Sequence, residues 1–344
     1  MRKAIVLTVL AVCAVMSGAA ANGPTPEFKK LRPALADPAQ GWTRLPAGNK
    51  LDGWKPVNET RENALRPNDW RIPVSVKLDP ADETKLVTEP YKGPAGVDSL
   101  AAFVNDRDGK SASLASPEEY GDLEVYVEYM VPKGSNSGVC LMGNYEIQIE
   151  DSYGVKDLKY GSNAGIYAMP GKNGRVGGQP PSVNVSRKPG EWQSLHIWFR
   201  APRFGADGKK VENARFLKVV HNGTQVHEEY ELFGSTRAVS PWPERAKAPL
   251  LLQGDHGPVA FRNLWVRPLR QATAQATPSQ QHRGEAANPG KGAACCARAG
   301  LRNQIWLPSR ISCPLMQPRP ADPKGLWSAG SWPTQGLIQT CDVT

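Results

Sequence analysis

The 344-residue sequence has little cysteine where a folded domain is expected. Between residues 22 and 270 the only cysteine is Cys140; the others are Cys13, Cys295, Cys296, Cys313 and Cys341. A lone cysteine in an apolar stretch is typical of a small buried hydrophobe. The four cysteines near the C-terminus lack the two-plus-two spacing of a zinc site. A disulfide framework is therefore excluded for residues 22–270, which need a packed core.

Long apolar runs and basic runs are also missing from this region. Of the formal net charge of +9, residues 1–21 carry +2 and residues 271–344 carry +4, which leaves +3 for residues 22–270. No segment there is apolar over the roughly 20 residues that a transmembrane helix needs. None combines a basic cluster with aromatic residues. The sequence therefore argues against an integral membrane segment and against a nucleic-acid partner.

The N-terminus carries an apolar run with the form of a secretory signal. Arg2 and Lys3 precede the run from Ala4 to Met16, and small residues follow as far as Ala21. We therefore expect a signal peptide over residues 1–21 and export to the periplasm or the extracellular space. Leu10–Cys13 faintly resembles a lipoprotein box, which leaves lipidation at Cys13 open.

Helical periodicity is scarce along the rest of the chain. Residues 22–40 are rich in Pro and Ala without a period, which predicts a lead-in linker. Residues 41–269 contain many short alternating strands separated by Gly, Pro, Asn and Asp. This region is predicted to be one all-β domain, an antiparallel β-sandwich. Residues 270–344 have no sustained apolar period, which predicts a low-complexity, disordered tail.

Several strands have a clear apolar face. Residues 123–131 alternate, and Leu195, Ile197 and Phe199 share one face of the segment 192–199. Asn222-Gly223 between two apolar runs predicts a tight hairpin, because both residues tolerate positive φ. We expect His221 and His227, which flank this hairpin, to be solvated.

The most informative stretch is Tyr145–Asp151. In an extended strand Tyr145, Ile147 and Ile149 would line a core face, and Glu146, Gln148 and Glu150 the opposite face. Two carboxylates and an amide in a row suit either a solvated sheet face or a site. Two further polar segments favour a site: the glycine-flanked turn that carries Asn136, and the bend Leu252–Asn263, which gathers Asp, His, Arg and Asn.

Together these stretches resemble the 3-keto-disaccharide hydrolase domain family, formerly a domain of unknown function, in the concanavalin A-like lectin/glucanase superfamily. The resemblance covers roughly residues 41–269. One departure is Ser162–Tyr167, where family members have a more acidic or cysteine-containing lead into Gly-Ile-Tyr. The matching pieces, in order, are Leu51–Trp54, Tyr120–Glu124, Asn136–Gly138, Tyr145–Asp151, Gly190–Trp192, Ala201–Phe204, Asn222-Gly223 and Asp255–Asn263.

The resemblance implies a jelly-roll sandwich with a sugar-binding groove on its concave face. Family members are expected to cleave the glycosidic bond of sugars already oxidised at C3. The C3 ketone acidifies the C2 proton, so a carboxylate or imidazole can remove it. Elimination of the C1 oxygen and hydration would follow, with donors stabilising the enolate. The substrate would be a carbohydrate, a 3-keto-glycoside or disaccharide.

Nine residues are candidates for this site. Those assigned to catalysis are Glu146, Glu150, Asp255 and His256, and those assigned to substrate binding are Asn136, Gln148, Arg262, Glu128 and Tyr167. Asp255 equally suits a turn-initiating role, and Arg262 equally suits pairing with a sheet-face carboxylate. Oxygen ligands would allow a divalent cation such as calcium, but no dedicated calcium loop is present, and the metal is left open.

Two other functions fit the same residues. A conventional glycoside hydrolase needs two carboxyl groups roughly 5–9.5 Å apart. Glu146 and Glu150 are four residues apart on a strand, so their backbones are separated by about 13 Å, which argues against a direct pair. A non-catalytic carbohydrate-binding module could use the same groove. If the row is catalytic, its partners are expected from Asp255–Asn263.

Overall fold

A computed structural model of the chain describes residues 23–45, 51–57, 66–90, 102–105, 108–237 and 242–269. The predicted signal peptide and the predicted tail lie outside the described residues. No helix within the described ranges is long and apolar enough to cross a bilayer.

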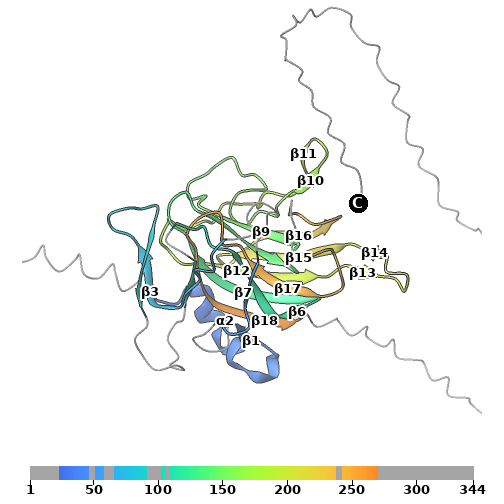
Figure 1. Cartoon of the computed structure of the whole chain (residues 1–344), viewed down its shortest axis with the longest axis horizontal. Coiled ribbons are helices and arrows are strands. Elements are labelled where there is room, and N and C mark those ends of the chain that lie inside the picture. The colour runs from blue at the N-terminus through green and yellow to red at the C-terminus, as the bar shows by residue number, and fades with distance from the viewer. Residues whose placement is uncertain are drawn as a thin grey trace, which may run out of the picture. The chain divides into compact units, whose positions relative to one another are not determined.

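The described residues form two large antiparallel sheets (Figure 1). The larger sheet consists, in spatial order, of β1 (Thr43–Leu45), β18 (Ala260–Pro268), β7 (Leu123–Met130), β12 (Gln193–Arg200), β15 (Ala214–His221) and β16 (Thr224–Leu232), with β5 (Phe103–Val104) also paired to β18. The smaller sheet consists of β2 (Lys55–Val57), β6 (Ser113–Tyr120), β17 (Ala248–Leu252), β8 (Asn136–Leu141) and β9 (Tyr145–Glu150).

Three hairpins stand beside these sheets. They pair β3 (Pro73–Leu78) with β4 (Leu86–Pro90), β10 (Met169–Gly171) with β11 (Gly174–Val176), and β13 (Arg203–Phe204) with β14 (Lys210–Glu212). The tight turn between β15 and β16 is the predicted one, with φ of 46° at Asn222 and 81° at Gly223. Its flanking histidines differ from the expectation: His221 and His227 are buried, not solvated.

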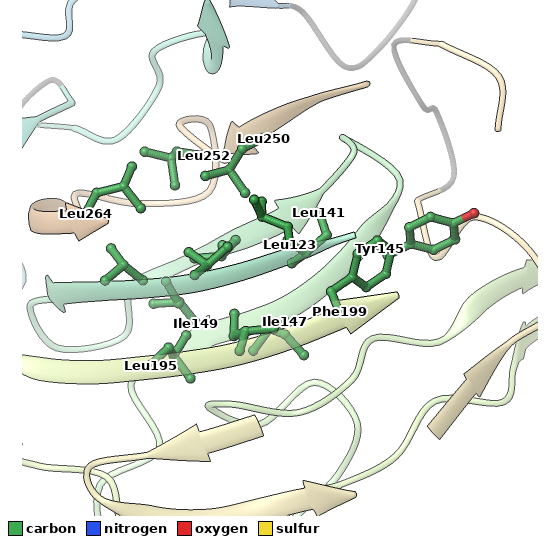
Figure 2. Packing of buried hydrophobic residues seen from close by; sticks show 14 of the residues in the cluster. Leu123, Leu141, Tyr145, Ile147, Ile149, Leu195, Phe199, Leu250, Leu252 and Leu264 are labelled. Carbon is green, nitrogen blue, oxygen red and sulfur yellow. The ribbon is translucent and has the colours of Figure 1, made fainter. Parts of the chain in front are cut away.

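The core lies between the inner faces of the two large sheets. Alternate residues of β7, β12, β9 and β17 belong to one buried apolar cluster. Figure 2 shows Ile147 and Ile149 of β9 gathered with Leu195 and Phe199 of β12 and with Leu250 and Leu252 of β17. Burying each such side chain contributes roughly 1.5–3 kcal/mol. The predicted antiparallel β-sandwich and its strand faces are confirmed.

Residues 22–40 differ from the predicted linker. They contain the helix α2 (Pro26–Ala36) and a 3-10 turn, η1 (Pro38–Gln40). Thr25 caps α2 by accepting a hydrogen bond from the Phe28 N–H, and Pro26 stands at the first helical position, where its missing N–H costs nothing. Phe28 and Leu35 pack against Tyr126 of β7, so α2 covers the outer face of the larger sheet.

Candidate functional site

The acidic row on β9 lies on the outer face of the smaller sheet, and two of its three members are buried. The exposed fraction is 5% for Glu146 and 3% for Gln148, whereas Glu150 is partly exposed. The chain bends back beside β9: the Ala164 N–H donates to the Gln148 carbonyl and the Tyr167 N–H to the Glu146 carbonyl. This segment covers the edge of the sheet, so the row is an enclosed surface rather than a solvated one.

Gly138 makes room for the Glu146 carboxyl group. β8 and β9 pair so that Gly138 lies opposite Gln148 and Cys140 opposite Glu146. A Cβ atom on Gly138 would collide with Oε1 of Glu146. The carboxyl group therefore leans along the sheet over the bare glycine, toward the strand on the other side of β8, which is β17.

Burial raises the pKa of Glu146 to about 7. A cationic neighbour is Arg237, whose Nη1 lies 4.0 Å from Oε2 of Glu146. The guanidinium is also buried, which lowers the pKa of Arg237 to about 10, and it donates a hydrogen bond of 2.8 Å to Sγ of Cys140. Glu146 is thus a carboxyl group that exchanges a proton near neutral pH, which suits a general base or acid.

Asp255 and His256 form a second polar pair directly after β17. Nδ1 of His256 lies 2.5 Å from Oδ1 of Asp255, and the Asp255 side chain is 5% exposed while that of His256 is 56% exposed. The hydrogen bond to Asp255 raises the pKa of His256. Burial alone would raise the pKa of Asp255, but His256 and the neighbouring Arg66 and Arg237 outweigh it and lower that pKa. Asp255 therefore orients the imidazole through Nδ1 and favours its protonated form.

Glu146 and the Asp255–His256 pair interact electrostatically. His256 and Asp255 both influence the pKa of Glu146, and Glu146 in turn contributes to the raised pKa of His256. The charges interact over more than hydrogen-bond distance, since no direct bond joins Glu146 to His256 among the described contacts. Glu146 and His256 therefore influence each other's protonation without a direct hydrogen bond.

Asn105 fixes the bend that carries His256. It is fully buried, and its Nδ2 donates to the carbonyls of Gly254, at 2.9 Å, and Gly257, at 2.8 Å. Its Oδ1 accepts the N–H of Val259 at 2.8 Å. One amide side chain thus ties down both ends of the bend, which reduces the freedom of His256.

A groove of about 440 Å³ lies beside Gln148 and Glu150 of the row. It is lined by Asn136, Gln148, Glu150, Val155, Asp157, Lys159, Tyr160, Gly161, Ser162 and Tyr167. The rings of Tyr160 and Tyr167 meet edge to face at 5.4 Å, and the Arg175 guanidinium lies 4.9 Å from the Tyr167 ring centre. Burial raises the pKa of Glu150. Amides, carboxylates and tyrosines in one concave surface provide the donors, acceptors and flat rings that sugar hydroxyls and ring faces need.

The structure brings seven of the nine candidates to this face. Asn136, Gln148, Glu150 and Tyr167 line the groove, and Glu146, Asp255 and His256 form the adjoining charged cluster. Within the described ranges, no group of three or more His, Cys, Asp and Glu side chains is placed to hold a metal ion. The structure therefore identifies no ligand set for the calcium left open above.

Glu128 and Arg262 require a correction. They lie on the outer face of the larger sheet, on the other side of the core, where Nε of Arg262 donates to Oε2 of Glu128 at 2.6 Å. Asn263 donates to the same oxygen, and the N–H and hydroxyl of Thr25 donate to Oε1. Neither side chain is more than 2% exposed. Their pairing is structural, as the alternative for Arg262 had it, and they take no part in the groove.

Four residues of this face were not predicted from the sequence. Arg237 and Arg175 lie in segments without a recognisable motif, and the pairing of Asn105 with a bend 150 residues away has no local signature. Gln253 could have been found, because it continues the alternation of β17, in which Leu250 and Leu252 face the core. Of these four residues, only Gln253 could have been predicted, from the alternation of its strand.

Comparison with known proteins identifies one family. The family model described as "3-keto-alpha-glucoside-1,2-lyase-like domain" matches residues 41–267. No curated protein matches the chain. The match runs from before β1 into β18, the last strand of the described residues.

Solved structures with some similarity have sugar-related names. One is named a putative glycosyl hydrolase from Parabacteroides distasonis, with 24% identity, coverage of 63% of this chain and 91% of that chain, and a TM-score of 0.41. A second protein of the same name and organism has 17% identity, coverage of 72% and 99%, and a TM-score of 0.41. A variant of the alginate lyase Aly36B in complex with alginate tetrasaccharide has 10% identity, coverage of 63% and 98%, and a TM-score of 0.28.

Proposed function

Because the chain belongs to the 3-keto-alpha-glucoside-1,2-lyase-like domain family, we propose that it cleaves 3-keto-glycosides with the cluster around Glu146 and His256. The family makes the chain a carbohydrate-active enzyme domain. The finer assignment depends on one observation: a buried carboxyl group with a pKa of about 7 interacts electrostatically with an imidazole whose pKa is raised by its hydrogen bond to Asp255. Such a pair can both take and give a proton near neutral pH.

The proposed reaction begins at C2 of the oxidised sugar. Glu146, in its carboxylate form, takes the C2 proton, which the neighbouring C3 ketone makes acidic. The electron pair left on C2 moves toward C3 and forms an enolate, whose charge is stabilised by Arg237 and the His256 imidazolium. Positioned acid–base groups of this kind contribute typically ~10²–10⁴-fold to the rate.

Elimination and hydration complete the cleavage. The enolate collapses to a C1=C2 double bond conjugated with the ketone, the C1–O bond breaks, and His256 donates its proton to the departing oxygen. Water then adds, with its hydroxyl to C1 and a proton to C2. The sum is one glycoside and one water converted to a 3-keto sugar and an alcohol. The groove lined by Gln148 and Tyr167 would hold the sugar during both steps.

A conventional two-carboxylate hydrolase is less well supported. Glu150 lies four residues along the strand from Glu146, too far for a facing acid and base. Asp255 has a lowered pKa and is hydrogen-bonded to His256, so it is poorly suited to donate a proton to a leaving group. A carbohydrate-binding module is the second candidate, favoured by the sugar-sized groove alone.

The decisive experiment uses a chromogenic 3-keto-α-glucoside, with the unoxidised p-nitrophenyl α-glucoside as control. We expect nitrophenol release only from the oxidised substrate, and a product that carries solvent deuterium at C2. Release from the unoxidised glucoside without deuterium would instead indicate conventional hydrolysis. Binding of both sugars without release across pH 5 to 9, with and without divalent cations, would indicate a binding module.

The place of action is also a proposal. Residues 1–21 have the charge, length and small-residue pattern of a secretory signal, and we propose that the enzyme acts in the periplasm or outside the cell. Fractionation of cells that express the full chain would check this, with activity in the cytoplasm as the contrary result.

A further inference from the structure

Gln253 carries a buried acceptor that nothing in the described chain satisfies. The residue is 6% exposed, and its Oε1 has no hydrogen-bond partner among the described residues. Leaving a buried polar group without a partner costs about 1–3 kcal/mol. Because native structures satisfy most such groups, an orphaned acceptor at a candidate site points to a ligand that supplies the donor.

The strand geometry directs this side chain into the site. Leu250 and Leu252 of β17 face the core, so Gln253 continues on the outer face. Its backbone is fixed on both sides, because its N–H donates to the Gly138 carbonyl at 3.0 Å and its carbonyl accepts the Ser137 hydroxyl at 2.8 Å. Gln253 is therefore held beside Gly138, across that glycine from Gln148.

Gln253 and the proposed base, Glu146, thus lie on the same face of the smaller sheet. The Glu146 carboxyl group leans over Gly138, and the Gln253 side chain rises from the strand on the other side of the same glycine. A sugar whose proton is within reach of Glu146 must lie over Gly138. The hydroxyls nearest to its ketone are then the groups that Gln253 can contact.

We propose that Gln253 determines substrate specificity by accepting a hydrogen bond from a hydroxyl that flanks the ketone of the reacting sugar, on C2 or C4. The ketone oxygen cannot satisfy Oε1, since it has no proton to donate. A hydroxyl can. This inference rests on the proposed function, because it takes Glu146 as the group that removes the C2 proton. It adds a reason for the enzyme to reject deoxygenated sugars.

The test combines substitutions of Gln253 with removal of single hydroxyl groups from the substrate. Wild type, Gln253→Met and Gln253→Ala are assayed for kcat/KM on p-nitrophenyl 3-keto-α-glucoside and on its 2-deoxy and 4-deoxy analogues. Met keeps the length of the side chain and removes the amide. We expect wild type to lose roughly 5–150-fold on one analogue, the range set by the cost of an unsatisfied acceptor. Both variants should lose a similar factor in kcat/KM on the parent substrate. Their kcat/KM on that analogue should equal their own value on the parent substrate.

Stability distinguishes binding from a structural role. If Oε1 is reserved for substrate, Gln253→Met should unfold at the same or a higher temperature than wild type, since it removes an unsatisfied buried group. The matched control is Gln225→Met at an exposed position of β16, which should leave activity and both analogue ratios unchanged.

Two results would overturn the inference, and they are separable from each other. If wild type cleaves the parent substrate but both Gln253 variants keep the wild-type discrimination against both analogues, the specificity role is wrong and the proposed function stands. If wild type neither binds nor cleaves the parent substrate, the proposed function fails and this inference fails with it.

Discussion

The two outer faces of the sandwich carry the same alternating pattern of glutamates, but the buried glutamates are paired differently on each face. On β7, Glu124 and Glu128 alternate with core residues, as Glu146 and Glu150 do on β9. Glu128 is fully buried and accepts hydrogen bonds from Arg262, Asn263 and Thr25. Glu146 is almost as buried, but its cationic partner Arg237 is 4.0 Å away. One face is closed by the chain itself, and on the other the carboxyl group is the proposed base.

The pKa directions express this difference. On the larger sheet, burial alone would raise the pKa of Glu124, but hydrogen bonds from His196 and Arg267 outweigh it and lower that pKa. On the smaller sheet, burial prevails and raises the pKa of Glu146 to about 7. The comparison teaches that hydrogen-bonding partners, rather than the strand pattern, decide in which direction the pKa of a buried sheet-face carboxylate shifts.

The largest expected effect is on the rate when Glu146 loses its charge. Glu146→Gln should lower kcat on the 3-keto substrate by ~10²–10⁴-fold, because an amide cannot accept the C2 proton. The matched control is Glu128→Gln on the opposite face, which should keep the kcat of the folded enzyme. A Glu146→Gln variant with wild-type kcat would remove Glu146 as the base.

The next effect is on stability, at the closed face. Arg262→Met leaves the Glu128 carboxylate buried without its cation, and we expect a loss of about 3–5 kcal/mol in the free energy of unfolding. Replacing both partners, as Glu128→Gln with Arg262→Met, should recover more than half of that loss. Denaturant titration measures both values. Equal losses in the single and double variants would contradict the ion-pair explanation.

The pH dependence of stability should reveal the open face. The pKa of Glu146 rises from its ordinary value of 4.5 to about 7 on folding, so between these values the folded state binds more protons than the unfolded state. Stability contributed by the protonated form is therefore present below pH 4.5 and lost as pH rises through 7, by about 3 kcal/mol. Comparison with Glu146→Gln isolates this contribution, and parallel pH curves would contradict it.

A smaller effect is expected from the amide that holds the His256 bend. Asn105→Ala leaves the carbonyls of Gly254 and Gly257 and the N–H of Val259 without their side-chain partner, at a cost of about 1–3 kcal/mol. Because His256 then loses its fixed place beside Asp255, the alkaline limb of the kcat/KM profile should move to lower pH. Asn213→Ala, which removes an amide that lies between β14 and β15 and donates to Glu231, serves as control. A destabilised variant with an unmoved pH profile would make Asn105 structural only.

The sequence predicted the strands and their faces because alternation is a local property. Ile147 and Ile149 had to face the core once Tyr145–Glu150 was extended. Alternation cannot name the partner of an outward-facing carboxylate, since that partner comes from a distant strand. For this reason Glu128 was grouped with the site, although Arg262 neutralises it from β18.

Two other differences have physical causes of the same kind. The helix α2 lacks a regular apolar period, and it is stabilised by its Thr25 cap and by packing against Tyr126. His221 was expected to be solvated because it flanks a turn. Its Nε2 instead lies within hydrogen-bond distance of Tyr129, Gln193 and Asn222, and burial lowers the pKa of His221 to about 3. Tertiary contacts decided both.

The way the larger sheet closes has a consequence for how the chain assembles. β18 lies between β1 and β7, and Thr43 pairs with Val266 across more than two hundred residues of chain. A nascent chain that ends before Ala260 therefore has neither the strand that joins these two nor the guanidinium that neutralises Glu128. Such non-local pairing slows folding. The sandwich is thus expected to assemble late and all at once, after its last strand has been made.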